Sequence, residues 1–465
     1  MQHSKIGRRG VLGGAVAAAA IAPLAACAGG SSNTPTDQAS TTDTSDDNPF
    51  GLAAGTSVEA VIFNGGYKTD YVDFAAAEMK KKFSDVTVEV KPSTQIAQEL
   101  QPRFVGGNPP DLIDNSGAGF IGFGSIIDQL DTLDDILDSN NYEGKPIKDT
   151  VFAGVKGPGT YDGKFAVLNY VLSIYGVWYS ASLFEENGWT PPKTYAEATE
   201  LGAKAKEKGK FLYLWGKEAA TYYLTSMISS AYKEGGLEVR KALENLEPNA
   251  WSQKPIQDVF KAMENIIKLG YMKPGGNGTQ FTAAQAQWSN GQEALLYPSG
   301  AWIENEMKSQ TKAGFKMMGV PELTVTTSPK LAYEAIRAEA GEGFIVPSKS
   351  KNPAGGKEVL RAMLSKEAAT NFARTRLAPT IVKDTVPADG FGSTALQSQS
   401  KMLADAGDNT FSMRFIFYYG MNKEQLVLMN SFMAGDSDTA VLTAGLQKIS
   451  DRVKADPNVK KITIE

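Results

Sequence analysis

Histidine and cysteine are almost absent from this sequence, which has one of each among 465 residues. They are His3 and Cys27, so every position after Cys27 lacks both an imidazole and a thiol. This excludes Ser-His-Asp and Cys-His triads, histidine general bases, and zinc sites built on histidine or cysteine. Carboxylate chemistry is the only common catalytic option that remains.

Basic residues are fewer than acidic ones. Lysine and arginine total 47 against 52 acidic residues, which gives a net charge of −5. Lys5, Arg8 and Arg9 lie in the first 26 residues, which contain no acid, so the remainder of the chain is more acidic still. An acidic surface does not suit nucleic acid or anionic lipid. We therefore expect no nucleic-acid partner.

The N-terminus has the features of a secretion signal. An apolar run over residues 11–24 follows the basic residues and is too short to span a membrane comfortably. The run leads into Leu24-Ala25-Ala26-Cys27, which matches the lipobox of bacterial lipoproteins. We expect residues 1–26 to be removed and Cys27 to be acylated, against the alternative of a chance cysteine. That places the protein on the extracellular face of the cytoplasmic membrane, exported by the Sec route or, given Arg8-Arg9, by the twin-arginine route.

The chain then alternates between strand and helix patterns. Residues 27–57 read as the lipidated cysteine and a flexible tether, and order is expected to begin at Val58. Strands are expected at 58–63, 86–90 and 111–114, with a helix capped by Thr69 after the first. This alternation favours an α/β fold with a mostly parallel sheet, whose ligands bind beyond the carboxyl ends of the strands. Three polar residues fall at those ends: Asn64, Asn115 and Ser116.

A second αβ region is expected from about Val167. The turn at 161–164 precedes an apolar, β-prone run over 165–179 that could carry the chain from one domain to the next. Later helices are expected at about 194–209, 219–232, 254–269, 301–309 and 355–374.

Aromatic and polar residues cluster in a way that suits a sugar. Aromatic rings stack on the C–H faces of sugars, while amides, carboxylates and guanidinium groups bond their hydroxyls. Trp302 follows a strand and a turn, and Trp215 lies close to Glu218 and Tyr222. The alternative for any one tryptophan is core packing. A further polar and aromatic group contains Arg374, Arg414 and Tyr418, although 411–419 could equally be one buried strand or helix.

Two other motifs have simpler interpretations. Residues 117–122 spell G-x-G-x-x-G, but a loop-like stretch follows instead of the helix of a dinucleotide site, so a glycine-rich turn is favoured and no cofactor is expected. Asp134-Asp135 and Glu185-Glu186 are neighbours that point in different directions, which makes them poor acid/base couples. We expect these charges to be solvated, although a carboxylate pair from distant positions stays open.

Four stretches resemble a known family. Residues 163–179, 184–195, 290–302 and 343–353 are similar, in order and spacing, to the extracellular solute-binding proteins of bacterial ABC sugar importers, which include maltose-binding protein. Within that family, two strings at 63–71 and 101–117 look like the lipoproteins that bind N-acetylglucosamine and its β-linked dimer, N,N′-diacetylchitobiose.

The resemblance implies a two-lobed fold of the periplasmic-binding-protein type (type II) that closes on a sugar by a hinge. The N-terminal lobe would take 58–166 plus about 319–380, and the C-terminal lobe 167–318 plus about 381–465. It also implies a monomeric protein without catalytic activity. Its partners would be the sugar, two permease subunits and, through the lipid, the membrane. It would make no contact with the transporter's ATPase. The ligand residues implied are a stacking Trp302, the second-lobe group Trp215, Glu218 and Tyr222, and the loop residues Asn115 and Ser116.

Three alternatives stay open at this point. The loop at Asn115 and Ser116 lacks the aromatic and acidic residues of maltose-binding protein, which argues against maltodextrin, although another maltose-, cellobiose- or xylose-type ligand is possible. A secreted carboxylate glycosidase acting on chitin or cell-wall oligosaccharides is the second alternative. A sensor lipoprotein without a transporter is the third.

Overall fold

The computed structural model describes residues 41–152 and 154–464, so Cys27 and the expected signal peptide lie outside the described residues. Three parallel strands begin the fold: β1 (Ser57–Phe63) lies between β2 (Thr87–Ser93) and β3 (Leu112–Asp114). Their order and type agree with the sequence pattern.

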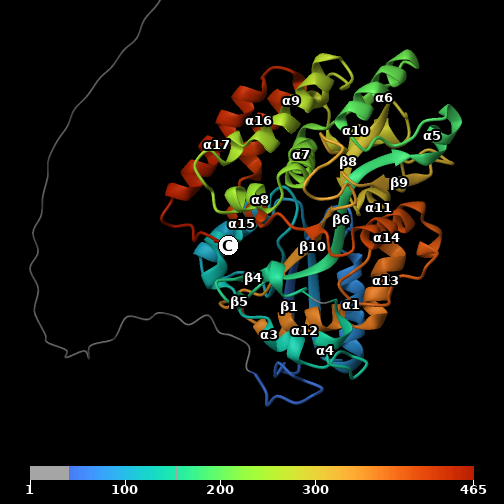
Figure 1. Cartoon of the computed structure of the whole chain (residues 1–465). Helices are drawn as coiled ribbons and strands as arrows, with labels where there is room; N and C mark the ends of the chain where they lie inside the picture. The colour runs from blue at the N-terminus through green and yellow to red at the C-terminus, as the bar shows by residue number, and fades with distance from the viewer. Residues whose placement is uncertain (1–40, 153, 465) are drawn as a thin grey trace, which may run out of the picture. The chain divides into compact units, whose positions relative to one another are not determined.

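Helices cover both faces of β1, because its apolar side chains point alternately to one face and the other. Val58, Ala60 and Ile62 are buried in one hydrophobic core with α1 (Asp70–Lys82) and α12 (Pro353–Met363). Val61 belongs to another core, together with α2 (Ile96–Val105). Because successive strand residues point to opposite faces, a run of apolar residues requires cover on both. In Figure 1, α1 and α12 lie side by side although they are far apart in the sequence.

A long strand, β6 (Leu168–Ser180), joins two groups of strands. Its first half pairs antiparallel with β10 (Ile336–Ile345), which in turn pairs with β3. Its second half pairs with β8 (Ala294–Gly300) and β9 (Met317–Val320). At the far edge, β7 (Phe211–Tyr213) pairs with β8, so the sheet order is β2-β1-β3-β10-β6-β8-β7. The apolar run expected to carry the chain onward is one continuous strand (Figure 1).

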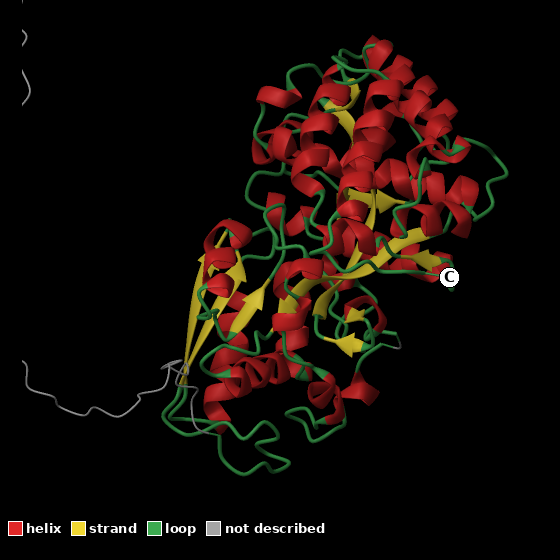
Figure 2. Ribbon diagram, turned by 90° about the vertical axis from the view of Figure 1, so that its left-hand side faces the viewer, coloured by secondary structure: helices red, strands yellow, loops and turns green. Residues whose placement is uncertain are grey.

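Helices from distant parts of the sequence pack together around α7 (Ala220–Gly235). Its neighbours include α9 (Lys254–Lys268) and α16 (Asn422–Ala434), and α16 packs on α17 (Thr439–Ala455). Figure 2 shows the upper part of the molecule, where Figure 1 labels these helices, as mostly helical with strands among the helices. No helix in the described part of the chain is both long and apolar enough to cross a membrane.

The remaining elements complete the fold. The expected helices at 194–209, 219–232 and 254–269 are confirmed as α6, α7 and α9, and the one at 301–309 is the shorter α11. The other bounds are α3 (Asp134–Asp138), α4 (Ile147–Thr150), β4 (Thr160–Tyr161), β5 (Lys164–Phe165), α5 (Ala181–Asn187), α6 (Tyr195–Glu207), β7 (Phe211–Tyr213), α8 (Leu237–Glu244), α10 (Phe281–Ser289), α11 (Ile303–Met307), α13 (Lys366–Arg376), α14 (Thr394–Ala406), β11 (Thr410–Phe411) and α15 (Arg414–Tyr419).

Two local features differ from the sequence pattern. The helix expected over 355–374 is two helices, because Ser365 interrupts it and its hydroxyl accepts a hydrogen bond from the Ala368 N–H of α13 at 3.2 Å. Order also begins before Val58. Phe50 and Leu52 are buried in the core beside β1, and the Arg361 guanidinium donates a hydrogen bond to the Asp47 carbonyl at 3.1 Å.

Candidate functional site

The loops after β1 and β3 meet at the carboxyl edge of the parallel strands, as the topology requires. The Phe63 ring lies between them, against Gly65 and Gly117. A Cβ added at Gly65 would lie 2.1 Å from the ring, and one at Gly117 would lie 2.2 Å from it. Only glycine permits so close an approach of both loops to the ring.

Trp302 lies at the start of α11, directly after β8, and contacts two tyrosines. Its ring centre is 5.5 Å from that of Tyr175 on β6, edge-on, and 5.6 Å from that of Tyr222 on α7. We call Trp302, Tyr175 and Tyr222 the aromatic cluster. Trp302 and Tyr222 are half-buried, so part of each side chain stays accessible. Three elements from separate parts of the chain thus build one aromatic surface.

The loop after β1 also reaches the aromatic cluster. A Cβ added at Gly66 would lie 3.0 Å from the Trp302 Cβ. The Asn305 side-chain amide, one turn into α11, donates a hydrogen bond to the Gly66 carbonyl. The two contacts join the carboxyl end of β1 to the start of α11.

A buried ion pair supports Tyr175 from behind. The Arg337 guanidinium lies 3.8 Å from the Tyr175 ring centre and donates two hydrogen bonds, of 2.6 and 3.0 Å, to Glu339. Glu339 also accepts the Met413 N–H at 2.6 Å. A guanidinium held this way has little freedom to move, so it orients the ring that Trp302 contacts.

A pair of carboxyl groups lies at the end of β3. Asp114 is fully buried, and its carboxylate accepts hydrogen bonds from the Ser116 hydroxyl at 2.5 Å and from the Tyr71 hydroxyl at 3.3 Å. Glu342 lies two residues before Phe344 of β10, which pairs with Asp114. Burial raises the pKa of Asp114 to about 6, and burial together with the charge of Asp114 raises the pKa of Glu342 well above its ordinary value.

Glu342 has an unusual backbone. Its φ is +52°, in the left-handed region that glycine favours. The pairing of β10 with β6 continues in register on both sides of Glu342, at Gly341 and Gly343, but skips Glu342 itself. Burial chiefly raises the pKa values of Tyr175 and Tyr222, and the Glu342 charge adds to both increases.

The predicted loop residues Asn64, Asn115 and Ser116 all lie at this edge. Asn64 is exposed, and its backbone N–H is bonded to the Ser93 carbonyl at 2.8 Å. Both ends of the Asn115 amide bond the backbone of Ile121 at 2.7 Å, which holds the loop closed. The Ser116 hydroxyl bridges Asp114 and the Gly343 N–H.

The structure separates the predicted second-lobe residues. Tyr222 contacts Trp302, whereas Trp215 is 2% exposed and its indole N–H donates to Asn430 at 3.4 Å. The Glu218 carboxylate accepts the Phe281 N–H at the start of α10. Trp215 thus occupies a core position, as the packing alternative expected, and its role with a ligand stays a prediction.

The structure also separates the members of the predicted group Arg374, Arg414 and Tyr418. The Arg414 guanidinium donates to the Thr160 carbonyl at 2.7 Å and lies over the Tyr161 ring, and Tyr418, 1% exposed, packs on the same ring. Arg374 is exposed on α13 beside Phe391. Residues 411–419, left open between strand and helix, are the end of β11 followed by α15.

Sequence reasoning missed Tyr175, Arg337, Asp114 and Glu342. Tyr175 falls within the expected apolar strand, where its neighbours across the sheet could not be known. Glu342 stands between two glycines, directly before one of the stretches that carried the family resemblance, and that setting was the available signal.

Residues 65–370 match the family described as bacterial extracellular solute-binding protein. This span covers the loop after β1, Trp302 and Glu342. The chain belongs to this family. It is therefore a solute-binding protein and not an enzyme.

Similar proteins agree with this assignment. The diacetylchitobiose binding protein NgcE of Streptomyces coelicolor is 59% identical over 466 residues, covering 100% of this chain and 99% of that protein. A solved chitin oligosaccharide binding protein is 16% identical, with a TM-score of 0.70 over 86% of this chain and 99% of that one. The protein RafE in complex with raffinose is 18% identical, with a TM-score of 0.68 over 86% of this chain and 100% of that one. The two structures establish the solute-binding fold.

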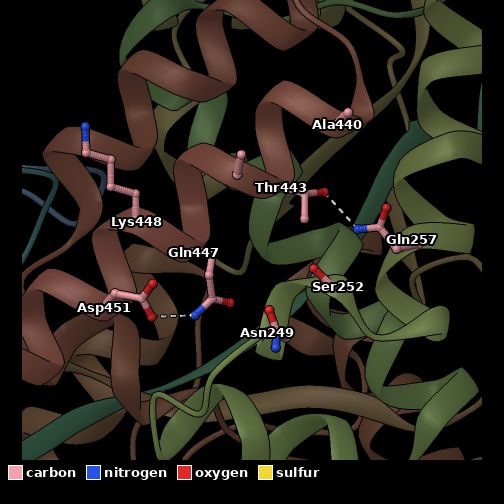
Figure 3. Close-up of a pocket in the computed structure, with 9 residues that line it drawn as sticks. Asn249, Ser252, Gln257, Ala440, Thr443, Gln447, Lys448 and Asp451 are labelled. Carbon is pink, nitrogen blue, oxygen red and sulfur yellow. Dashed lines mark hydrogen bonds between the residues drawn. The ribbon is translucent and has the colours of Figure 1, made fainter.

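This solute-binding protein also has a polar groove of about 520 Å³ between α9 and α17 (Figure 3). The Gln257 amide donates to Thr443 at 2.8 Å and the Gln447 amide to Asp451 at 2.7 Å. The lining side chains contain no aromatic ring, and these amides already bond their neighbours. The aromatic cluster is therefore the better candidate for binding a solute.

Proposed function

We propose that this protein is the substrate-binding lipoprotein of an ABC sugar importer and that it binds N-acetylglucosamine, N,N′-diacetylchitobiose or both. The observation that carries the proposal is the 59% identity, over the whole chain, to a diacetylchitobiose binding protein. Identity at that level over the full length supports a shared ligand class.

The aromatic cluster is where the sugar binds in this proposal. Trp302 offers a half-buried aromatic face for the C–H side of a sugar ring. Asn64 is exposed in the loop after β1, which reaches Trp302 through Gly66, and would bond the hydroxyl and acetamido groups.

Binding would involve two lobes with the boundaries expected above, 58–166 plus about 319–380 and 167–318 plus about 381–465. β6 pairs with strands of both groups, which suits a connection between lobes. The contacts of Trp302 and Asn305 with Gly66 would separate as the lobes open to admit a sugar. The closed form would deliver the sugar to two permease subunits, without touching the ATPase.

The protein would act as a monomer held at the extracellular face of the cytoplasmic membrane by lipid on Cys27. Two or more acyl chains give stable anchoring. Replacing Cys27 with serine should move the protein from the membrane fraction to the medium, because serine does not accept the lipid. Retention of Cys27→Ser in the membrane fraction would show that the anchor lies elsewhere.

Calorimetric titration of the purified protein with N-acetylglucosamine, diacetylchitobiose, maltose and cellobiose tests the ligand. We expect heat of binding with one or both of the first two sugars. Binding of maltose or cellobiose alone would overturn the ligand assignment. Uptake of diacetylchitobiose that is unaffected by deletion of the gene would favour a sensor over a transport component.

A further inference from the structure

Glu306 lies one turn along α11 from Trp302 and next to it on the helix surface. Its backbone N–H donates to the Trp302 carbonyl at 2.9 Å, and residues four apart on a helix are neighbours. We propose that the Glu306 carboxylate binds the sugar that stacks on Trp302, as the acceptor for one of its hydroxyl or acetamido N–H groups. This rests on the proposed function and deepens it, because it assigns a residue that selects for donor groups on the sugar.

The accessible part of α11 faces the loop after β1. Ile303 and Met307 point from the helix into the core, where neither is more than 1% exposed. Asn305 points the other way and donates to the Gly66 carbonyl. Around the helix axis, Glu306 lies between these two directions, and it is half-buried. It therefore borders the aromatic cluster with part of its side chain accessible.

A buried amide holds the Glu306 carboxylate. Gln285 of α10 is fully buried, and its side-chain N–H donates to Glu306 at 2.6 Å. Ala284 and Trp288 of the same helix belong to an apolar core. The Gln285 amide oxygen has no hydrogen-bond partner in the described part of the chain. Burying an amide with one end unpaired costs free energy, and such a cost is expected where a side chain orients a functional group.

The Glu306 carboxylate can accept further hydrogen bonds. Within residues 41–152 and 154–464, Gln285 provides its one side-chain hydrogen bond, whereas an ionised carboxylate has about four acceptor positions. Burial raises the pKa of Glu306, while the bond from Gln285 and the charge of Lys68 favour the ionised form. Sugar hydroxyls and acetamido N–H groups are donors, and their bonds to a charged acceptor are stronger than bonds between neutral groups.

Calorimetric titration with diacetylchitobiose compares variants of this pair with the wild type. Glu306→Ala should weaken binding by about 10- to 100-fold, the range for a hydrogen bond to a charged group. Glu306→Gln keeps the size and an acceptor oxygen but loses the charge, so it should weaken binding by about 3- to 10-fold. Gln285→Leu should also weaken binding, because the carboxylate is no longer oriented. It removes a buried unpaired amide, so it should unfold at a temperature equal to or above that of the wild type.

Glu304→Ala is the matched control. Glu304 is also half-buried on α11, but its carboxylate accepts a hydrogen bond from the Ser393 hydroxyl at the start of α14. Residues two apart on a helix do not face the same way, so Glu304 points away from the carboxylate of Glu306. Glu304→Ala should bind the sugar as the wild type does.

The outcomes separate this proposal from the proposed function. Wild-type affinity in Glu306→Ala, or equal losses in Glu306→Ala and Glu304→Ala, would overturn the role of Glu306 and leave the sugar assignment intact. If the wild type binds maltose or cellobiose instead, the ligand assignment fails, and the same variants titrated with that sugar still decide the role of Glu306. Absence of binding to all four sugars would overturn both.

Discussion

The Arg337 guanidinium stacks 3.8 Å above the centre of the Tyr175 ring, while the same ring meets Trp302 edge-on. An ion pair with Glu339, in which Arg337 is 2% and Glu339 8% exposed, holds the guanidinium in place. A buried ion pair on β10 thereby fixes the orientation of an aromatic ring on β6, next to the residue we expect to stack on the sugar.

Replacing Arg337 with methionine should lower the free energy of unfolding by about 3 kcal/mol, because Glu339 is left buried without its cation. Urea denaturation measures this. The matched control is Arg452→Met, which breaks an exposed ion pair with Glu424 and should cost no more than about 1 kcal/mol. Equal losses in the two variants would contradict a special role for the buried pair.

Replacing Trp302 with alanine should weaken sugar binding by about 1–3 kcal/mol through lost stacking and burial. Calorimetry with diacetylchitobiose measures this. Trp189→Ala, which removes a ring packed on Phe184 in another part of the fold, should leave the affinity unchanged. If Trp302→Ala binds with wild-type affinity, Trp302 is not a ligand residue.

Replacing Trp215 with alanine should chiefly affect stability. The side chain is 2% exposed and packs against Gly276, so its loss should reduce the free energy of unfolding by about 3–5 kcal/mol. Urea denaturation again measures this. A variant that keeps wild-type stability but loses sugar binding would show that Trp215 acts on the ligand and not in the core.

Replacing Asp114 with asparagine should change how stability depends on pH. Burial raises the pKa of Asp114 to about 6 in the folded protein, so the folded state retains a proton that the unfolded chain releases near pH 4. Wild-type stability should therefore fall as the pH rises from about 4 to 6, and the Asp114 contribution to this fall, on the order of 2 kcal/mol, should be missing in the variant. Thermal unfolding across pH 4–7 is the measurement, and parallel curves for the two proteins would count against the raised pKa of Asp114.

Local patterns in the sequence predicted the helices and strands whose formation depends on local contacts. The helices α6, α7 and α9 follow from residues three and four apart, and β1 and β3 follow from short apolar runs. Because carboxyl ends of parallel strands meet at one edge, Asn64 and Asn115 could also be placed near the site in advance. Trp302 could be singled out because it follows a strand and a turn.

Only the tertiary structure decided which side chains meet at that edge. Asp114 and Glu342 are more than 200 positions apart, and Tyr175, Tyr222 and Trp302 come from three separate elements. The alternation of a strand tells which residues share a face, but it does not tell which strand lies beside it. The order β3-β10-β6-β8 places Asp114, Glu342 and Tyr175 on neighbouring strands. The sequence alone therefore predicted the class of protein and the edge that carries the site, whereas the pairing of distant strands determined the residues that build it.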